Sequence, residues 1–163
     1  MASAPRFLGL ARTTLDSKNR ITIPAKFRSK LPAGSDGKFV LLVMPGAGFR
    51  HLELFDQVNG EQRVERLTVG NGLPGVDERQ REVMLAHVEE VELDAQGRLL
   101  LPAEHIQFAK LKGEVVVSGA GSHIKVYDAQ EAAGFAPVSV ADLDPAKVAA
   151  IFDKANSRPA QQQ

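Results

Sequence analysis

The sequence predicts an α+β fold that is mainly β and consists of two similar repeats in one chain. The first observation is a frame that occurs twice, as LDSKNRITIP at 15–24 and as LDAQGRLLLP at 93–102. The second is a later similarity between MPGAGFRHLELFD at 44–56 and SGAGSHIKVYD at 118–128. Because the matches recur in the same order at both ends, we predict repeats at about 10–57 and 88–131.

Each repeat is expected to open with a β-hairpin. The expected strand pairs are 10–15 with 21–23, and 88–93 with 99–101. The tight turn between them needs a positive φ, which Gly97 adopts freely and Asn19 tolerates. Asp16 and Asp94 stand at the turn entrances, where an aspartate side chain can accept hydrogen bonds from backbone amides.

A short helix and two more strands complete each repeat. Pro24 and Pro102 suit the first position of a helix, because proline has no amide hydrogen to satisfy there. The remaining strands are expected at 39–44, 52–55, 114–118 and 124–127, with a glycine-rich turn inside each pair.

Helices are expected outside the repeats. Asp56 can cap a helix that reaches about Thr68, and Asp77 can cap a second one after a break at 69–75. These form a linker at 58–87. A C-terminal helical segment at 132–156 contains a helix from Pro145, capped by Asp144, with apolar residues at helical spacing. That apolar set is Val148, Ile151, Phe152 and Ala155. The tail at 157–163 is expected to be disordered.

Composition and charge narrow the class of protein. The chain has 163 residues, 44% hydrophobic and 25% charged, with no cysteine and no apolar run long enough for a membrane helix. Its start lacks the apolar region of a signal peptide. The absence of cysteine excludes disulfides and is consistent with a reducing compartment. Net charge is zero, yet residues 1–31 hold seven basic residues against one acid. This asymmetry favours a localised anion-binding face.

The twin Asp-x-x-x-Arg turns and their spacing resemble the MraZ family of bacterial regulators, over about Arg6 to Phe152. The resemblance implies two AbrB-like repeats that intertwine as a swapped-hairpin, double-psi-like barrel within one chain. It implies a homo-oligomeric ring that binds repeated boxes of double-stranded promoter DNA, in the cytoplasm and at the nucleoid. One departure is Asn19, where the family usually has glycine. Since asparagine tolerates this conformation, we expect the fold to be unchanged.

A DNA-binding role is expected for the basic residues of the first repeat. Arginine suits it because its planar fork can grip phosphate, or O6 and N7 of guanine. The expected contacts are Arg20, Lys18, Arg12, Arg6, Lys26, Arg28 and Lys30. A turn-forming or positioning role is expected for Asp16, Asn19, Asp94, Gly97 and Arg98. Arg98 has mostly acidic sequence neighbours, so we expect the first repeat to bind DNA and the second to serve folding and assembly.

Other interpretations remain open at this level. Each Asp–Arg pair could be only an ion pair that stabilises its turn. The chain could be an AbrB-like scaffold that binds an acidic protein partner. An enzyme on a related double-psi barrel is disfavoured, because no nucleophile–base pair stands out, and the glycine turns lack the lysine of a phosphate-binding loop. We expect no cofactor, no metal, no small-molecule substrate and no membrane association. The four histidines, at 51, 87, 105 and 123, are interpreted as structural.

Overall fold

The structure, a computed structural model, describes residues 6–45, 48–69, 73–134 and 140–156. Its strands are β1 Leu10–Thr14, β2 Arg20–Thr22, β3 Lys38–Pro45, β4 Arg50–Phe55, β5 Glu89–Glu92, β6 Arg98–Leu100, β7 Glu114–Gly119 and β8 Ile124–Asp128. Its helices are α1 Ala25–Arg28, α2 Gln57–Thr68, α3 Glu78–Ala86, α4 Ala103–Ala109, a 3-10 turn Val140–Asp142 and α5 Pro145–Asn156. The α+β, mainly β class is confirmed, and the expected elements occur within a few residues of their predicted ranges. The disordered tail predicted at 157–163 lies outside the described residues.

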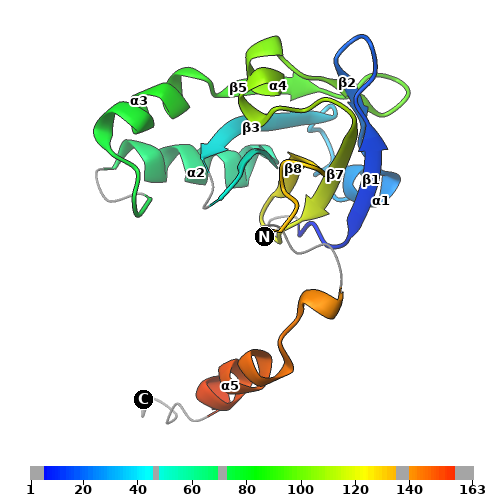
Figure 1. Ribbon diagram of the computed structural model, residues 1–163. Coiled ribbons are helices and arrows are strands. Elements are labelled where there is room, and N and C mark those ends of the chain that lie inside the picture. Colours follow the sequence, from blue (N-terminus) through cyan, green and yellow to red (C-terminus); the bar gives the residue numbers. More distant parts are fainter. Residues whose placement is uncertain (1–5, 46–47, 70–72, 135–139, 157–163) are drawn as a thin grey trace.

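The strands form a six-stranded antiparallel sheet in the order β1-β7-β8-β4-β3-β5 and a separate two-stranded ribbon, β2-β6 (Figure 1). The expected closed barrel is not found. In the described part of the chain, β1 and β5 are the two edges of the sheet and do not pair with each other. Each edge strand has only one hydrogen-bonded neighbour, so the sheet stays open.

The two repeats exchange strands. β1 of the first repeat pairs with β7 of the second, β5 of the second pairs with β3 of the first, and β2 pairs with β6. The predicted strand pairing of the two opening hairpins is therefore wrong, apart from an isolated bridge between Leu93 and Leu99. The predicted pairs β3–β4 and β7–β8 within the repeats are confirmed. The turns do reverse the chain, as the hydrogen bond from Asp16 N to Arg20 O shows. After each turn, the next strand pairs with the equivalent strand of the other repeat, β2 with β6. This pairing buries Ile21 and Leu99 completely.

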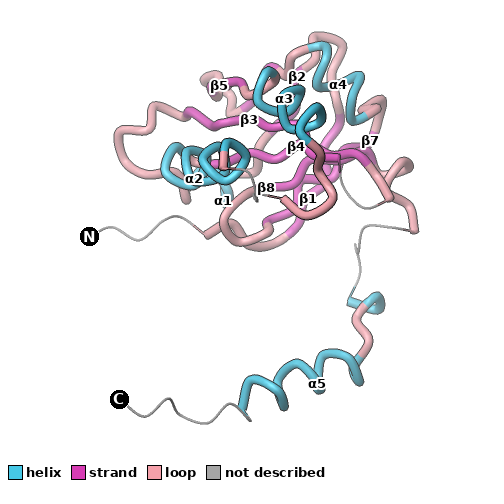
Figure 2. The backbone as a smooth tube through the Cα atoms, turned by 90° about the vertical axis from the view of Figure 1, so that its left-hand side faces the viewer, coloured by secondary structure: helices cyan, strands magenta, loops and turns pink. Residues whose placement is uncertain are grey.

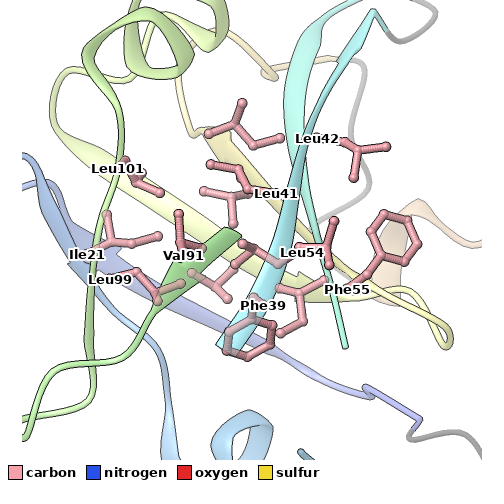
Figure 3. Close-up of a cluster of buried hydrophobic side chains, with 14 of the residues drawn as sticks. Ile21, Phe39, Leu41, Leu42, Leu54, Phe55, Val91, Leu99 and Leu101 are labelled. Carbon is pink, nitrogen blue, oxygen red and sulfur yellow. The ribbon is translucent and has the colours of Figure 1, made fainter. Parts of the chain in front are cut away.

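The core contains side chains from both repeats in one cluster. Figure 3 shows Ile21 and Phe39 of the first repeat close to Val91, Leu99 and Leu101 of the second. All five are at most 8% exposed. Burying a side chain of this size stabilises a fold by about 1.5–3 kcal/mol. Neither repeat could bury these side chains alone, so the core accounts for the exchange of strands.

Helix α2 packs across the sheet through a glycine. The Asp56 side chain caps the helix as predicted, accepting hydrogen bonds from the amides of Val58 and Asn59. One turn later Gly60 lies against Val40 of β3. Leu67 is buried, whereas Val58 is 51% exposed, because it lies on the face of the helix turned away from the core.

We expect the substitution Gly60→Ala to destabilise the fold. A β-carbon at Gly60 would lie 2.8 Å from Cβ and from Cγ2 of Val40, closer than such atoms approach. The resulting strain should lower the free energy of unfolding by about 1–3 kcal/mol, partly offset by the helix preference of alanine. Urea denaturation measures this. Gly113→Ala is the matched control, because nothing lies within 4 Å of its added β-carbon. Equal stability of the two variants would contradict this packing.

Helices α3 and α5 also begin where the sequence predicts. Asp77 caps α3 in a capping box with Gln80, and Asp144 accepts hydrogen bonds from the amides of Ala146 and Lys147 at the start of α5. In the two views α5 lies apart from the sheet (Figures 1 and 2). None of the helices that the structure describes is long and apolar enough to cross a membrane.

Candidate nucleic-acid interface

The first Asp–Arg turn is held by a single carboxylate. Asp16 Oδ1 accepts hydrogen bonds from the amides of Lys18 and Arg20, each at 2.9 Å. Asp16 Oδ2 accepts one from Arg20 Nε at 2.8 Å. Asn19 closes the turn with φ of 61°, the left-handed conformation expected for this position. The aspartate therefore fixes both the turn and the base of the arginine fork.

The second turn repeats this geometry. Asp94 Oδ1 accepts from the amides of Gln96 and Arg98 at 2.9 Å, and Asp94 Oδ2 accepts from Arg98 Nε at 2.9 Å. Gly97 has φ of 75°. In both turns the pKa of the aspartate is lowered, first by the hydrogen bond from the arginine backbone amide and then by the arginine side chain. The ion pair that was one interpretation of each Asp–Arg turn is therefore present in both turns.

The two arginines differ in what their terminal nitrogens contact. Arg98 Nη2 donates to Gln96 Oε1 at 3.2 Å, so its fork is held against its own turn. The residue equivalent to Gln96 is Lys18, which is exposed and cannot accept such a bond. Among the described residues, Arg20 contacts Asp16 through Nε, and its two terminal nitrogens have no hydrogen-bond partner. Only the first turn offers an unoccupied arginine fork next to a lysine.

Each turn accepts a backbone hydrogen bond from the opposite repeat. Ile23 N donates to Gly97 O at 2.9 Å, and Leu101 N donates to Asn19 O at 2.8 Å. Helix α1 begins directly after the first of these contacts, and helix α4 directly after the second. The short helix of each repeat therefore follows the segment bound to the turn of the other.

This exchange changes the charges around the turns. Arg28 of α1 lies over the second turn, since a β-carbon at Gly97 would be 2.7 Å from Arg28 Cζ. Glu104 lies in the first turn of α4, which follows the segment bound to the first Asp–Arg turn. The expectation of a basic first turn and an acidic second turn assumed that sequence neighbours are spatial neighbours. That assumption fails at the second turn, where Arg28 of the first repeat lies, and the two turns also differ in their own side chains.

The other predicted cations are spread over several elements. Arg12 on β1 forms an ion pair with Glu114 of β7. Lys26 Nζ donates to Leu10 O at 2.8 Å and lies 5.3 Å from the centre of the Phe27 ring. The side chains of Arg6 and Lys30 are exposed. Arg12 and Lys26 are therefore partly engaged within the chain.

A buried charged cluster joins the two repeats away from these turns. Glu53 of β4 is 3% exposed, and its Oε2 lies 2.8 Å from His123 Nε2 and 3.5 Å from His51 Nε2. Its Oε1 lies 3.3 Å from Arg63 Nη2 on α2. Burial by itself raises the pKa of Glu53, but the two adjacent histidines and the charge of Arg63 outweigh it and hold the pKa well below its usual range.

Glu53 is a residue of this cluster that no sequence motif predicted. The sequence does mark it in one way, because Glu53 is the only acid in the apolar run HLELF at 51–55. The histidine that begins this run, His51, has an equivalent in the second repeat, His123. The other histidine pair lies between α3 and α4, where His105 Nε2 contacts His87 O at 2.7 Å. The pKa of His87 is raised, chiefly by its contact with Val83 O and also by Glu104. Within the described ranges, no group of three or more potential ligands is arranged to hold a metal.

Fold and site define a class of protein: an α+β chain of two strand-exchanged repeats, each presenting an Asp–Arg turn. Comparison with known proteins is more specific. A family model described as "MraZ protein, putative antitoxin-like" matches residues 84–134. Proteins named Transcriptional regulator MraZ are similar over most of the chain. The relative from Limosilactobacillus fermentum is 33% identical over 151 residues, 90% of this chain and 96% of its own length.

Two further relatives of that name give the same result. The protein of Nitrosomonas europaea is 34% identical over 125 residues, covering 75% of this chain and 80% of its own. That of Thiobacillus denitrificans is 30% identical over 122 residues with the same coverage. The chain therefore belongs to the MraZ family, whose members are transcriptional regulators and not enzymes.

Proposed function

We propose that this chain is a sequence-specific DNA-binding transcriptional regulator and that Arg20 is its principal DNA contact. The observation that supports this most directly is the Arg20 fork. Asp16 holds Nε at 2.8 Å, and the two terminal nitrogens remain without a partner among the described residues. A guanidinium anchored at Nε presents two parallel donors, which match two phosphate oxygens or O6 and N7 of guanine.

The remaining basic residues supply phosphate contacts in this proposal. Lys18 lies exposed at the tip of the first turn, beside Arg20. Arg6, Lys26, Arg28 and Lys30 add positive charge, and Arg12 adds less because it is paired with Glu114. Lysine and arginine bind phosphate largely by releasing counterions, without reading the sequence. Specificity would therefore depend on Arg20, and affinity on the whole set.

The second turn has a supporting role in this proposal. Arg98 is held by Asp94 and Gln96, and Gly97 leaves the space that Arg28 occupies. The second turn thus positions a cation of the first repeat. The cross-repeat pairing of β1, β2 and β5 supports a swapped-hairpin arrangement, although the sheet is open.

We further propose that several copies assemble in a ring that binds repeated promoter boxes at the nucleoid. One chain offers a single unoccupied arginine fork among its described turns, which is little for tight and specific binding. Several copies linked in one assembly bind repeated boxes more tightly, because each later contact becomes intramolecular.

Salt-dependent fluorescence anisotropy tests this function with DNA from upstream of the chain's own gene. We expect the logarithm of the binding constant to fall linearly with the logarithm of salt concentration. Lys30→Ala should reduce the slope of this line by about one unit for each chain bound, and it should weaken binding to all DNA sequences equally. Lys112→Ala is the control, because Lys112 lies near Glu131, at 3.7 Å, outside the proposed interface. Absence of DNA binding at low salt would favour the scaffold that binds an acidic protein.

A further inference from the structure

The C-terminal segment exposes apolar side chains that its own chain leaves uncovered. Val140 is 86% exposed, Leu143 61%, Ile151 66% and Phe152 65%. In both views α5 lies apart from the sheet and from α2 (Figures 1 and 2). A helix of 12 residues is marginal in water by itself, because helices of this length depend on packing of an apolar face. The segment therefore needs a surface to cover it.

Helix α5 has a defined apolar face with charge beside it. Val148, Ile151 and Phe152 recur at the spacing that places side chains on one face. Lys147 and Lys154 lie on one flank of that face, seven positions apart and so on the same side of the helix. A partner surface should combine an apolar groove with an acidic edge.

The body of the molecule has such a groove. It has a volume of about 440 Å³ and lies where α2 meets β3 and the start of β5. Val40, Val64 and Val88 contribute its apolar lining. Its length suits α5, because both helices have 12 residues and so extend about 18 Å.

Acidic residues surround this groove. Glu61 and Glu65 come from α2, and Glu89 and Glu90 come from β5. Only Glu90 has a basic ion-pair partner among the described residues, Lys38 at 3.4 Å. The charge of the groove is therefore opposite to that of the lysine flank of α5.

We propose that α5 of one copy docks in the groove between α2 and β5 of a second copy. This inference rests on the proposed assembly and names its contact. Because the two surfaces differ, the contact is heterologous, and successive copies form a closed ring or an open chain. The apolar face of α5 is buried, and its lysines meet the glutamates of α2.

Sedimentation velocity of the full chain tests the apolar part. The double substitution Ile151→Asp with Phe152→Asp should weaken self-association about a hundredfold, the effect of losing a central apolar anchor. Ala150→Asp is the control, because it places a negative charge on the opposite face of α5 and should leave the mass unchanged. An unchanged mass for the double variant, or an equal loss for the control, would overturn the proposal.

Charge reversal tests whether α5 binds the groove of a second copy. Glu61→Lys with Glu65→Lys should weaken assembly, and so should Lys147→Glu with Lys154→Glu. Mixing the two variants should restore it, because each then offers a surface complementary to the other. Restoration only when all four changes are in one chain would show that α5 binds its own groove and would overturn the proposal. Glu82→Lys on α3, which does not line the groove, is the control.

DNA binding separates this inference from the function on which it rests. Dissociated variants should still bind a single short DNA site at low salt, because α5 contributes none of the proposed DNA contacts. Loss of assembly with retained short-site binding supports both proposals. An intact assembly that binds no DNA would contradict the function alone.

Discussion

Replacing Arg20 by alanine is expected to weaken binding to the promoter DNA about tenfold to a hundredfold for each chain that contacts the DNA. A bidentate arginine contact is worth about 1–3 kcal/mol of discrimination, and 1.4 kcal/mol corresponds to a factor of ten. Fluorescence anisotropy at fixed salt measures the loss. Because Arg20 is partly exposed and its ion pair lies at the surface, the variant should keep the fold and the oligomeric state of the wild type.

Arg98→Ala is the matched control for this prediction. Its turn has the same backbone and the same Asp–Arg bond, and Arg98 has one further bond to Gln96, so the loss of turn stability should be at least as large in Arg98→Ala as in Arg20→Ala. The arginine fork of Arg98 already contacts Gln96, and we expect its removal to cost far less DNA affinity. Equal losses with correct assembly would contradict the division of roles between the repeats.

Arg20→Lys refines the result. Lysine keeps the positive charge but has no planar fork, so it cannot donate two parallel hydrogen bonds. We expect it to keep the salt dependence of binding and to lose sequence discrimination. Unchanged DNA affinity and unchanged sequence discrimination in this variant would show that residue 20 contacts phosphate alone.

Replacing Glu53 by alanine is expected to lower the free energy of unfolding by about 3–5 kcal/mol, a large part of the stability of a small domain. Glu53 is 3% exposed and lies against His51, His123 and Arg63. Its removal leaves these groups in a buried site without the carboxylate that they contact. Chemical denaturation measures the loss. Glu114→Ala, which removes an exposed ion pair with Arg12, should cost less than about 1 kcal/mol. A similar loss for both variants would contradict the role of the cluster.

The pH dependence of stability gives a second measure of the same cluster. The pKa of Glu53 is lowered in the folded chain from an ordinary value of 4.5, so the folded state binds its proton less readily than the unfolded state. The stabilisation is therefore complete above that ordinary value and is lost as pH falls towards the folded pKa. The wild type should lose stability below about pH 4.5 more steeply than Glu53→Gln. Parallel curves would contradict this linkage.

The local features of this chain could be predicted because their causes act over a few residues. Asp16 and Asp94 cap turns that require a left-handed residue, and the positive φ values at Asn19 and Gly97 follow that expectation. Aspartates also begin α2, α3 and α5, since a side-chain acceptor satisfies the first amides of a helix.

The partners of β1, β2, β5 and β6 could not be predicted from local patterns, unlike the pairs β3–β4 and β7–β8, which short turns join. Both repeats contain the same strand signals, so pairing within a repeat and pairing between repeats look alike over any short window. Burial of Ile21 and Leu99 in one common core decides between them, and that is a property of the whole chain. The same limit concealed Glu53, whose partners lie on β4, α2 and the turn before β8.

The sequence by itself therefore determined the two repeats, the Asp–Arg turns, the helix caps and the resemblance to one family. The tertiary structure decided which strands pair, which charges meet at each turn and which arginine keeps an unoccupied fork. The reason is that capping and turn formation depend on hydrogen bonds between near neighbours. Pairing and charge environment depend on how distant segments share one core, and strand exchange placed Arg28 beside Gly97, 69 positions away in the sequence.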